Sequence, residues 1–233
     1  MTVKEFYEDS YGSLGFKAQR KYPNEELCRF MGRNFFDYPI KGRSDIKILE
    51  TGCGSGANLW MIAKEGFDTY GIDLSENAIR LCKSMLDNYN TTATLSVADM
   101  TELDFVDDHF DAIVDVFSSN CMGRAQHGKY LSEVHRTLKP GGRFFSYFPS
   151  KNSDMFKYPG NAEFIDTDTL LSITREGSPF FGQNYPFRFL YPSEYRNEIS
   201  KIGLHPEYME IVYKSYRQRR ELMEFVVIEG VKK

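Results

Sequence analysis

The stretch from residue 48 to residue 57 constrains this chain most, because an apolar run stops there at three glycines spaced two residues apart. It reads Ile-Leu-Glu-Thr-Gly-Cys-Gly-Ser-Gly-Ala, and a helical pattern follows. We therefore expect a strand, a tight loop and the start of a helix. Glycines suit such a loop because they adopt conformations closed to other residues, and because a Cβ would keep a ligand away from the backbone amides. The helix directs free N–H groups at the same place.

An acidic residue at a suitable distance strengthens this interpretation. Asp73 stands 21 positions after Gly52, at the end of the next apolar run, residues 69–72. At this offset an acid can reach the hydroxyls of a ribose. The pattern therefore predicts a site for a cofactor that contains a nucleoside. A glycine-rich turn without a ligand is the alternative.

Length and charge limit what the chain can be. Its 233 residues fit one α/β domain, residues 1–233, with a substantial core. The net charge of −4 argues against a broad surface for nucleic acid or an anionic membrane, so a small molecule is the expected partner. The four cysteines are widely separated and suggest neither a zinc site nor a disulfide framework. Without a recognisable signal core or membrane span, we expect a cytoplasmic protein.

Between residues 46 and 148, strand patterns alternate with helix patterns, which predicts a parallel sheet covered on both faces. Strands are expected at residues 46–50, 69–73, 94–98, 112–116 and 143–148. Helices are expected at residues 24–35, 55–64, 75–86, 129–138 and 192–202. Two further strand-like runs, residues 207–213 and 222–231, have so short a connection that they must be antiparallel.

Two aromatic-rich segments flank this regular part. Residues 1–45 are predicted to form an N-terminal cap, in which residues 6–22 are the best candidate for a mobile lid. Residues 150–191 lose the periodicity and gain aromatic side chains, and an insertion of this length is usually functional. We expect this insertion to cover the substrate. The basic run 214–220 is interpreted as a solvated turn rather than an RNA site.

The glycine loop alone leaves two kinds of cofactor open. Gly52-x-Gly54-x-x-Ala57 followed by Asp73 also satisfies the dinucleotide fingerprint of NAD-binding proteins. An NAD-dependent dehydrogenase of this topology generally brings a second substantial domain or a recognisable catalytic set. Little chain is left here for either, so the surrounding motifs have to decide.

Five short motifs occur in order along the chain: ETGCGSG at 50–56, GIDLS at 71–75, ADM at 98–100, FDAIV at 110–114 and LKPGGRF at 138–144. Together they resemble the motifs of class I S-adenosylmethionine-dependent methyltransferases of the small-molecule type. In that family the acid of the second motif holds the ribose. The acid of the third meets the adenine amino group, and the next residue packs on the ring.

The resemblance covers residues 46–148 strongly and residues 190–231 by layout only. It implies an α/β fold with a Rossmann-like, doubly wound, seven-stranded sheet, mostly parallel with one antiparallel strand in a C-terminal hairpin. It implies S-adenosyl-L-methionine as the cofactor and S-adenosyl-L-homocysteine as the product. The implied cofactor contacts are Glu50, Gly52, Asp73, Asp99 and Met100. We also include in the predicted cofactor site Gly54, Gly56, Leu74, Asp115 and Tyr11. For Tyr11, which could close over the cofactor, lid packing is the alternative.

The segment after the fourth strand, residues 115–122, departs from the family pattern, because it is polar where relatives often have an apolar stretch ending in histidines. It also lacks the Asn/Asp-Pro-Pro-Tyr/Phe sequence of relatives that methylate amides or adenine N6, which disfavours those substrates. Asn120 is predicted to orient the acceptor. His127 is predicted to act as a general base, since histidine titrates near neutrality. The alternative for His127 is a surface histidine with no task.

The aromatic insertion is predicted to roof the acceptor pocket, with Arg188 and Tyr185 as substrate-binding residues. Asp166 and Asp168 could hold a cation, since hard cations take carboxylate oxygens, but helix capping is as natural and no metal is predicted. The many rings favour a small organic acceptor.

These observations predict an S-adenosylmethionine-dependent methyltransferase that methylates oxygen or nitrogen of a small metabolite or biosynthetic intermediate, with neither nucleic acid nor membrane as a partner. Because the sulfonium of the cofactor is a strong electrophile, the protein has chiefly to hold a nucleophile in line and exclude water. An NAD(P)-dependent oxidoreductase and a non-catalytic S-adenosylmethionine-binding protein are the alternatives.

Overall fold

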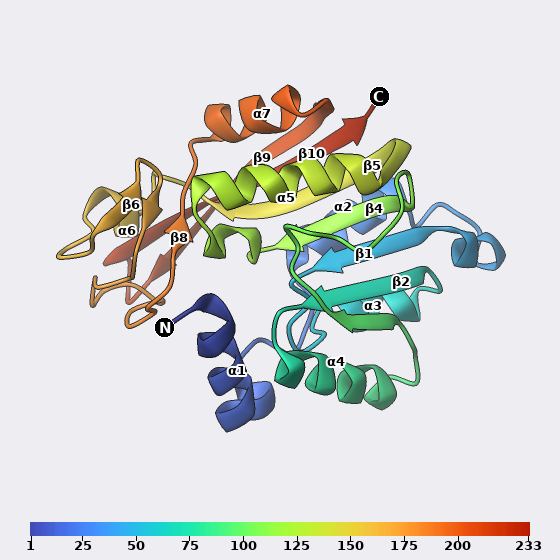
Figure 1. The fold of residues 1–233 in the computed structure, drawn as a ribbon, viewed down its shortest axis with the longest axis horizontal. Coiled ribbons are helices and arrows are strands. Elements are labelled where there is room, and N and C mark those ends of the chain that lie inside the picture. The colour runs from blue at the N-terminus through green and yellow to red at the C-terminus, as the bar shows by residue number, and fades with distance from the viewer.

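The computed structural model describes residues 1–233, and a seven-stranded sheet runs through its centre (Figure 1). The strands of this sheet are β1 Lys47–Thr51, β2 Asp68–Asp73, β3 Thr94–Val97, β4 Phe110–Val116, β5 Leu138–Pro149, β9 Leu204–Tyr216 and β10 Glu221–Lys232. Their spatial order is β3-β2-β1-β4-β5-β10-β9. The paired strands are parallel except at β10, which is antiparallel to both β5 and β9. The predicted fold class, with one antiparallel strand in a C-terminal hairpin, is confirmed.

Helices cover both faces of the sheet. They are α1 Val3–Leu14, α2 Glu25–Asn34, α3 Leu59–Lys64, α4 Glu76–Asn88, α5 Arg124–Thr137, α6 Asp154–Lys157 and α7 Pro192–Lys201. Figure 1 shows α5 and α7 in front of the sheet and α2 and α3 behind it. The predicted helices are present, although α3 begins four residues later and α5 five residues earlier than predicted. None of these helices has both the length and the apolar character needed to cross a bilayer.

Neighbouring residues of the central strands pack into two different apolar cores. Ile48 and Phe145 belong to the core that includes α2, whereas Leu49 and Phe144 belong to the core that includes α5 and α7. Successive side chains of a strand point to opposite faces, and both faces of this sheet are covered. The central strands are therefore apolar on both sides, which is why they read as continuous apolar runs.

The N-terminal helix α1 was not predicted, because residues 6–22 were expected to form a loose lid. A capping box begins this helix: Thr2 Oγ1 accepts a hydrogen bond from Glu5 N at 3.2 Å, and Glu5 Oε2 accepts one from Thr2 N at 2.7 Å. The helix ends at Gly15, whose φ is 56°. The spacing of Thr2 and Glu5 is a helix-start signal that the sequence analysis overlooked.

The insertion 150–191 lies beyond the carboxyl ends of β4 and β5, on the left in Figure 1. It contains α6 and a small antiparallel sheet of β6 Phe164–Asp166, β7 Thr169–Leu170 and β8 Phe187–Arg188. Several of its rings, including Phe187 and Phe189, are fully buried in the core behind the central sheet. Part of the aromatic content of the insertion therefore serves packing.

We predict that Phe145→Ala lowers the free energy of unfolding by about 3–5 kcal/mol, because it removes a fully buried ring and leaves a cavity. The ring of Phe145 packs between the sheet and helix α2, where its centroid lies 5.0 Å from the centroid of the Phe30 ring. Urea denaturation followed by circular dichroism measures the change. The control is Phe181→Ala, since Phe181 is 56% exposed and should change stability by less than about 0.5 kcal/mol. Equal effects of the two substitutions would contradict the packing described here.

Candidate functional site

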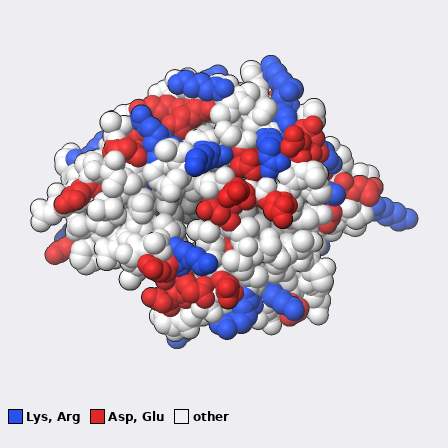
Figure 2. All heavy atoms as spheres, in the orientation of Figure 1, with Lys and Arg blue, Asp and Glu red and all other residues white.

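A cavity of about 960 Å³ opens at the carboxyl ends of β1, β2 and β4. Glu50 and Gly52 line it from the end of β1, Asp73 from the end of β2, Tyr11 from α1 and Tyr185 from the insertion. Figure 2 shows a hollow near the middle of this face, with basic and acidic side chains interspersed around it. Ligands of open α/β sheets bind at this end of the strands. The cavity is therefore the candidate functional site.

The glycine loop forms one wall of the cavity and has no room for side chains. Gly52 and Gly54 have φ values of 69° and 52°, in the left-handed region that favours glycine. A Cβ at Gly52 would lie 2.6 Å from Ser118 Oγ, and one at Gly54 would lie 2.5 Å from Tyr11 Oη. Gly56 packs against Cys82 of α4 and does not line the cavity. The loop thus reaches the cavity at Gly52, whereas Gly54, like Gly56, does not line it, and the contacts of all three glycines with a cofactor stay predictions.

Asp73 links the end of β2 to the glycine loop. Its Oδ2 accepts a hydrogen bond from Gly54 N at 2.9 Å, and its Oδ1 accepts one from Ser75 N at 3.0 Å. Burial raises the pKa of Asp73 above its ordinary value, and these backbone hydrogen bonds offset only part of that effect. A carboxylate has about four lone-pair positions, so Asp73 can still accept hydrogen bonds from a ligand.

Glu50 presents an unsatisfied oxygen at the same wall. Its Oε1 accepts a hydrogen bond from Asn58 Nδ2 at 2.5 Å, whereas its Oε2 is buried without a partner. Burial raises the pKa of Glu50 to about 8. Asn58 Oδ1 in turn accepts from Arg20 Nη2 at 3.0 Å. An unpartnered buried acceptor is costly, and a ligand ammonium group placed here would satisfy it.

The residues predicted to hold the adenine also line the cavity. Leu74, Asp99 and Met100 all contribute to its wall. The carboxylate of Asp99 is oriented by Thr101, whose backbone N and Oγ1 both donate to Asp99 Oδ1 at 2.8 Å. Leu74 and Met100 add apolar surface suited to the face of a ring. Together with Asp73 and Glu50, these residues line one cavity, and their roles toward a cofactor stay predictions.

Helix α1 covers the cavity from the side of α4. Tyr11 is only 2% exposed, and its hydroxyl lies against Gly54. Glu8 ties the helix to the first turn of α4, because its Oε2 accepts hydrogen bonds from Ser75 Oγ at 2.5 Å and Asn77 N at 3.3 Å. A carboxylate is favourable at the N-terminus of a helix. The lid segment is thus anchored next to Asp73.

Asp115 lies outside the cavity wall, although it was predicted as a cofactor contact. It is fully buried, and its oxygens accept hydrogen bonds from the hydroxyls of Ser118 at 2.6 Å, Ser119 at 2.5 Å and Ser146 at 2.9 Å. Ser118 Oγ also donates to the carbonyl of Thr51 at 2.7 Å. Asp115 therefore supports the loop after β4, and its contact with the cofactor stays a prediction.

His127 and Asn120, the predicted catalytic residues, also do not line the cavity. The alternative that His127 is a surface residue is wrong, because its side chain is fully buried. Its Nδ1 lies 3.2 Å from Glu198 Oε2, and burial lowers the pKa of the ring despite this carboxylate. Asn120 is buried with no hydrogen-bond partner for either amide atom. The catalytic roles of both residues stay predictions.

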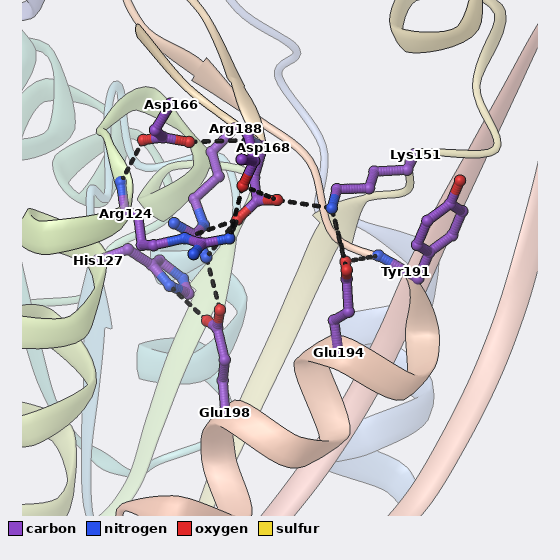
Figure 3. A network of polar contacts seen from close by, with 10 residues as sticks. Arg124, His127, Lys151, Asp166, Asp168, Arg188, Tyr191, Glu194 and Glu198 are labelled. Carbon is purple, nitrogen blue, oxygen red and sulfur yellow. Dashed lines mark hydrogen bonds and ion pairs between the residues drawn. The ribbon is translucent and has the colours of Figure 1, made fainter.

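A charged network that includes Arg188 joins the insertion to α5 and α7 (Figure 3). Arg188 Nη2 donates to Glu198 Oε1 at 2.6 Å and lies 3.5 Å from Asp168 Oδ2. Asp168 also binds Lys151 Nζ at 2.6 Å and pairs with Arg124. Arg188 is fully buried and does not line the cavity, so the structure places this predicted substrate residue in a structural network. Tyr185, the other predicted substrate residue, does line the cavity.

Asp166 and Asp168 have different partners. Asp166 Oδ2 accepts a hydrogen bond from Arg124 N at 2.9 Å, at the first residue of α5, and its Oδ1 accepts one from Asp168 N at 2.9 Å. Asp166 therefore caps a helix, which agrees with the capping alternative, although the helix is not adjacent in sequence. Asp168 is surrounded by the cationic side chains of the network.

Sequence reasoning missed several residues of the cavity wall, among them Asn58, Arg20 and Gln183. Asn58 directly precedes α3, two positions after the last glycine of the loop, and an amide at this place was an available signal. Arg20 and Gln183 lie in irregular segments, where no periodicity marks a residue as facing a ligand.

The chain was also compared with known proteins. A family model described as a methyltransferase domain matches residues 48–142, which contain the glycine loop, Asp73, Asp99 and β4. This match falls on the same motifs that build the cavity wall, on the strand order described above. The chain carries a class I S-adenosylmethionine-dependent methyltransferase domain. S-adenosylmethionine is the cofactor of this family.

Individual relatives of this methyltransferase domain match over part of their length. Sterol 24-C-methyltransferase of Saccharomyces cerevisiae is 29% identical over 151 residues, which cover 62% of this chain and 38% of that protein. Fatty-acid O-methyltransferase of Mycolicibacterium smegmatis is 36% identical over 101 residues, 42% of this chain and 35% of that protein. The chain thus spans less than two fifths of the length of these two relatives.

A solved structure extends the likeness to the whole chain. It is 1,6-didemethyltoxoflavin-N1-methyltransferase of Burkholderia thailandensis with bound 1,6-didemethyltoxoflavin and S-adenosylhomocysteine. The TM-score is 0.60 at 14% identity, covering 100% of this chain and 92% of that one. At this identity the likeness concerns the fold.

We predict that Asp73→Ala weakens the binding of S-adenosylhomocysteine by about 1.5–3 kcal/mol, the size of a lost hydrogen bond to a charged group. Isothermal titration calorimetry measures the change. Asp68→Ala is the matched control, because Asp68 lies at the opposite end of the same strand, away from the cavity. Unchanged affinity of the Asp73 variant would mean that this acid does not bind the ribose.

We predict that cofactor binding depends on pH, because the Glu50 carboxyl group is buried and its Oε2 has no partner. Glu50 retains its proton up to about pH 8, and an ammonium group beside Oε2 favours the ionised form. Binding of S-adenosylhomocysteine should therefore release up to one proton, and its affinity should rise between about pH 6 and about pH 8. Because the unfolded chain loses this proton near pH 4.5, the free energy of unfolding should fall as the pH rises through the same range.

Calorimetry in two buffers of different ionisation enthalpy measures the released proton. Glu50→Gln cannot release one and serves as the control. Proton uptake by the unmodified protein, or equal release by the Gln variant, would show that another group titrates on binding.

We predict that Asp168→Ala lowers the free energy of unfolding by about 3–5 kcal/mol, because it leaves the buried Arg188 without one of its two carboxylates. Burial alone would raise the pKa of Asp168, but hydrogen bonds from Lys151 and Arg124 hold it below its ordinary value of 3.8. The stabilisation is therefore present above that pH and is lost as the pH falls further. Urea denaturation of this variant and of Glu163→Ala, an exposed acid of the same insertion, measures the difference. If both variants lost a similarly small amount of unfolding free energy, the network would not stabilise the fold.

Proposed function

We propose that this protein transfers the methyl group of S-adenosylmethionine to an oxygen or nitrogen of a small metabolite or biosynthetic intermediate. The observation that supports this most is that one cavity has the family's cofactor motifs on one wall and the aromatic insertion on another. Its volume of about 960 Å³ is near the upper end of ligand sites, which span roughly 300–1,000 Å³. Both a cofactor and a small acceptor can therefore be accommodated.

Each part of the cofactor has a partner in this proposal. Glu50 Oε2 binds the ammonium group, and Asp73 binds the ribose hydroxyls. Asp99 binds the adenine amino group, while Leu74 and Met100 pack on the ring. When bound, S-adenosylmethionine supplies an electrophilic methyl group. The backbone of the glycine loop lies close beneath it because Gly52 and Gly54 carry no side chains.

The contribution of the protein to methyl transfer is then mainly positioning. Helix α1 and the insertion enclose the cavity and exclude water, while the acceptor is held in line with the methyl group. The proposed base His127 lies outside the cavity wall, and Asn120 lies behind it. A nucleophilic acceptor attacks the methyl carbon while the C–S bond breaks and its electron pair stays on sulfur, and the proton of the methylated O–H or N–H group is lost to solvent when the product leaves. Tyr185 stands at the acceptor end, whereas Arg188 holds the insertion in place.

The first experiment titrates the purified protein with S-adenosylhomocysteine and, separately, with NADH by calorimetry. Binding of S-adenosylhomocysteine is expected, and heat with NADH alone would favour the oxidoreductase alternative. The protein is then incubated with methyl-labelled S-adenosylmethionine and a small-molecule cell extract, and the labelled product is identified by mass spectrometry.

Three outcomes of the extract experiment separate the candidate functions. A labelled small molecule, absent with the Asp73→Ala variant, supports the proposal. Cofactor binding without transfer to any component would favour a non-catalytic S-adenosylmethionine-binding protein. A labelled macromolecule would show that nucleic acid or protein is the acceptor. That result would contradict the expectation of a small-molecule partner, which rests on the negative net charge of the chain.

A further inference from the structure

The acceptor end of the cavity has a wall without charged side chains. Six lining residues come from positions 116–126 and five from positions 171–186, and none of them is acidic, basic or histidine. The charged residues Glu50, Asp73 and Asp99 lie at the cofactor motifs instead, and Arg20 donates to Asn58 beside Glu50. The exposed Lys4 of α1 lies on the N-terminal side of the cavity. An ionised acceptor group buried against residues 116–126 and 171–186 would therefore lose water without gaining a counter-ion.

Aromatic rings make this wall flat and hold its polar groups in place. Phe117 stacks on Phe180 with ring centroids 5.1 Å apart and an interplanar angle of 30°. The centroid of the Tyr185 ring lies 4.9 Å from the centroid of the Phe6 ring and 5.4 Å from that of the Tyr7 ring. Stacked aromatic surface of this kind suits a ring in the ligand.

Three neutral polar groups interrupt the apolar surface. The hydroxyls of Tyr7 and Tyr185 share a hydrogen bond of 2.9 Å, and Cys121 Sγ lies 3.8 Å from the Tyr7 hydroxyl. Burial raises the pKa of both tyrosines and of Cys121, the latter to about 12, so all three groups stay neutral near pH 7. They can donate and accept hydrogen bonds, but they neither balance a charge nor remove a proton from the acceptor.

Gln183 adds an acceptor atom with no partner. Its Oε1 is buried and receives no hydrogen bond, although the residue lines the cavity. A buried carbonyl oxygen of this kind favours a ligand that brings an O–H or N–H donor. A donor on the ligand would supply the hydrogen bond that this atom lacks.

We propose that the acceptor is an uncharged ring compound with a hydrogen-bond donor that binds Gln183 Oε1, next to a polar group that binds the Tyr7–Tyr185 hydroxyl pair. This inference rests on the proposed methyl transfer and adds the chemical class of the substrate. It excludes carboxylates and ammonium compounds as acceptors. Phe117 and Phe180 provide the surface on which the ring lies.

Binding of three matched probes to the protein saturated with S-adenosylhomocysteine tests the inference. The probes are methyl 4-hydroxybenzoate, its carboxylate 4-hydroxybenzoate, and methyl 4-methoxybenzoate, which has no donor. Ligand-observed NMR titration at pH 7.5 gives the dissociation constants. We expect the neutral hydroxy ester to bind at least about tenfold more tightly than either of the other two, a difference of about 1.4 kcal/mol.

Two variants examine the role of Gln183. Gln183→Leu removes the unpartnered oxygen at similar volume, and it should abolish the preference for the hydroxy ester over the methoxy ester. Gln218→Leu is the matched control, because Gln218 is exposed in the turn between β9 and β10 and does not line the cavity, and it should keep the preference. Both proteins are first shown to bind S-adenosylhomocysteine as the unmodified protein does, which establishes that they are folded.

Tighter or equal binding of the carboxylate would overturn the inference about charge. Equal binding of the two esters, or an unchanged preference in Gln183→Leu, would overturn the role of the donor. Failure of both neutral esters to bind, while S-adenosylhomocysteine binds, would overturn the inference and leave the proposed methyl transfer standing. Failure of S-adenosylhomocysteine itself to bind would instead overturn the proposed function, and this inference with it.

Discussion

The hydrogen bond between the Gly54 amide and the Asp73 carboxylate, 2.9 Å long, is the contact on which the cofactor site depends. It joins the loop after β1 to the end of β2, next to a backbone bond from Cys53 N to Ile72 O of 2.9 Å. Because Gly54 has no Cβ, Tyr11 of α1 can pack directly against this loop, where a Cβ would lie 2.5 Å from its hydroxyl. Asp73 thus shapes the loop while it faces the cavity, and both tasks require the same ionisable group at the end of the strand.

The sequence predicted the central sheet well because the relevant signals are local. Apolar runs such as residues 112–116 are buried on both faces of the sheet, and the ends of these runs coincide with the ends of strands. The predicted residues Glu50, Asp73 and Asp99 lie within a few positions of such ends, and parallel strands bring these ends together at one edge. A short motif was therefore enough to place each of them on one cavity.

The parts that could not be predicted depend on contacts between distant segments. His127 is buried because α5 packs between β5 and α7, where Glu198, 71 residues further along the chain, meets its ring. Arg188 is typical of a residue that binds a polar ligand, yet its partners Asp168 and Glu198 come from the turn between β6 and β7 and from α7. No pattern in the sequence near either residue distinguishes a buried ion pair from a ligand contact. Burial of such groups is decided by tertiary packing.

The two ends of the cavity are supported by different physical interactions, which in the proposed function would separate cofactor binding from acceptor choice. The cofactor end is built from backbone amides and carboxylates of the central sheet. The acceptor end includes Gln183 and Tyr185, which lie just before β8, where Phe187 enters the core and Arg188 enters the charged network. Because Arg188 is fixed by Glu198 and Asp168, the residues before it are held at the cavity without contacting the cofactor motifs. If Gln183 binds the acceptor as proposed, its substitution changes acceptor binding while the cofactor end stays intact.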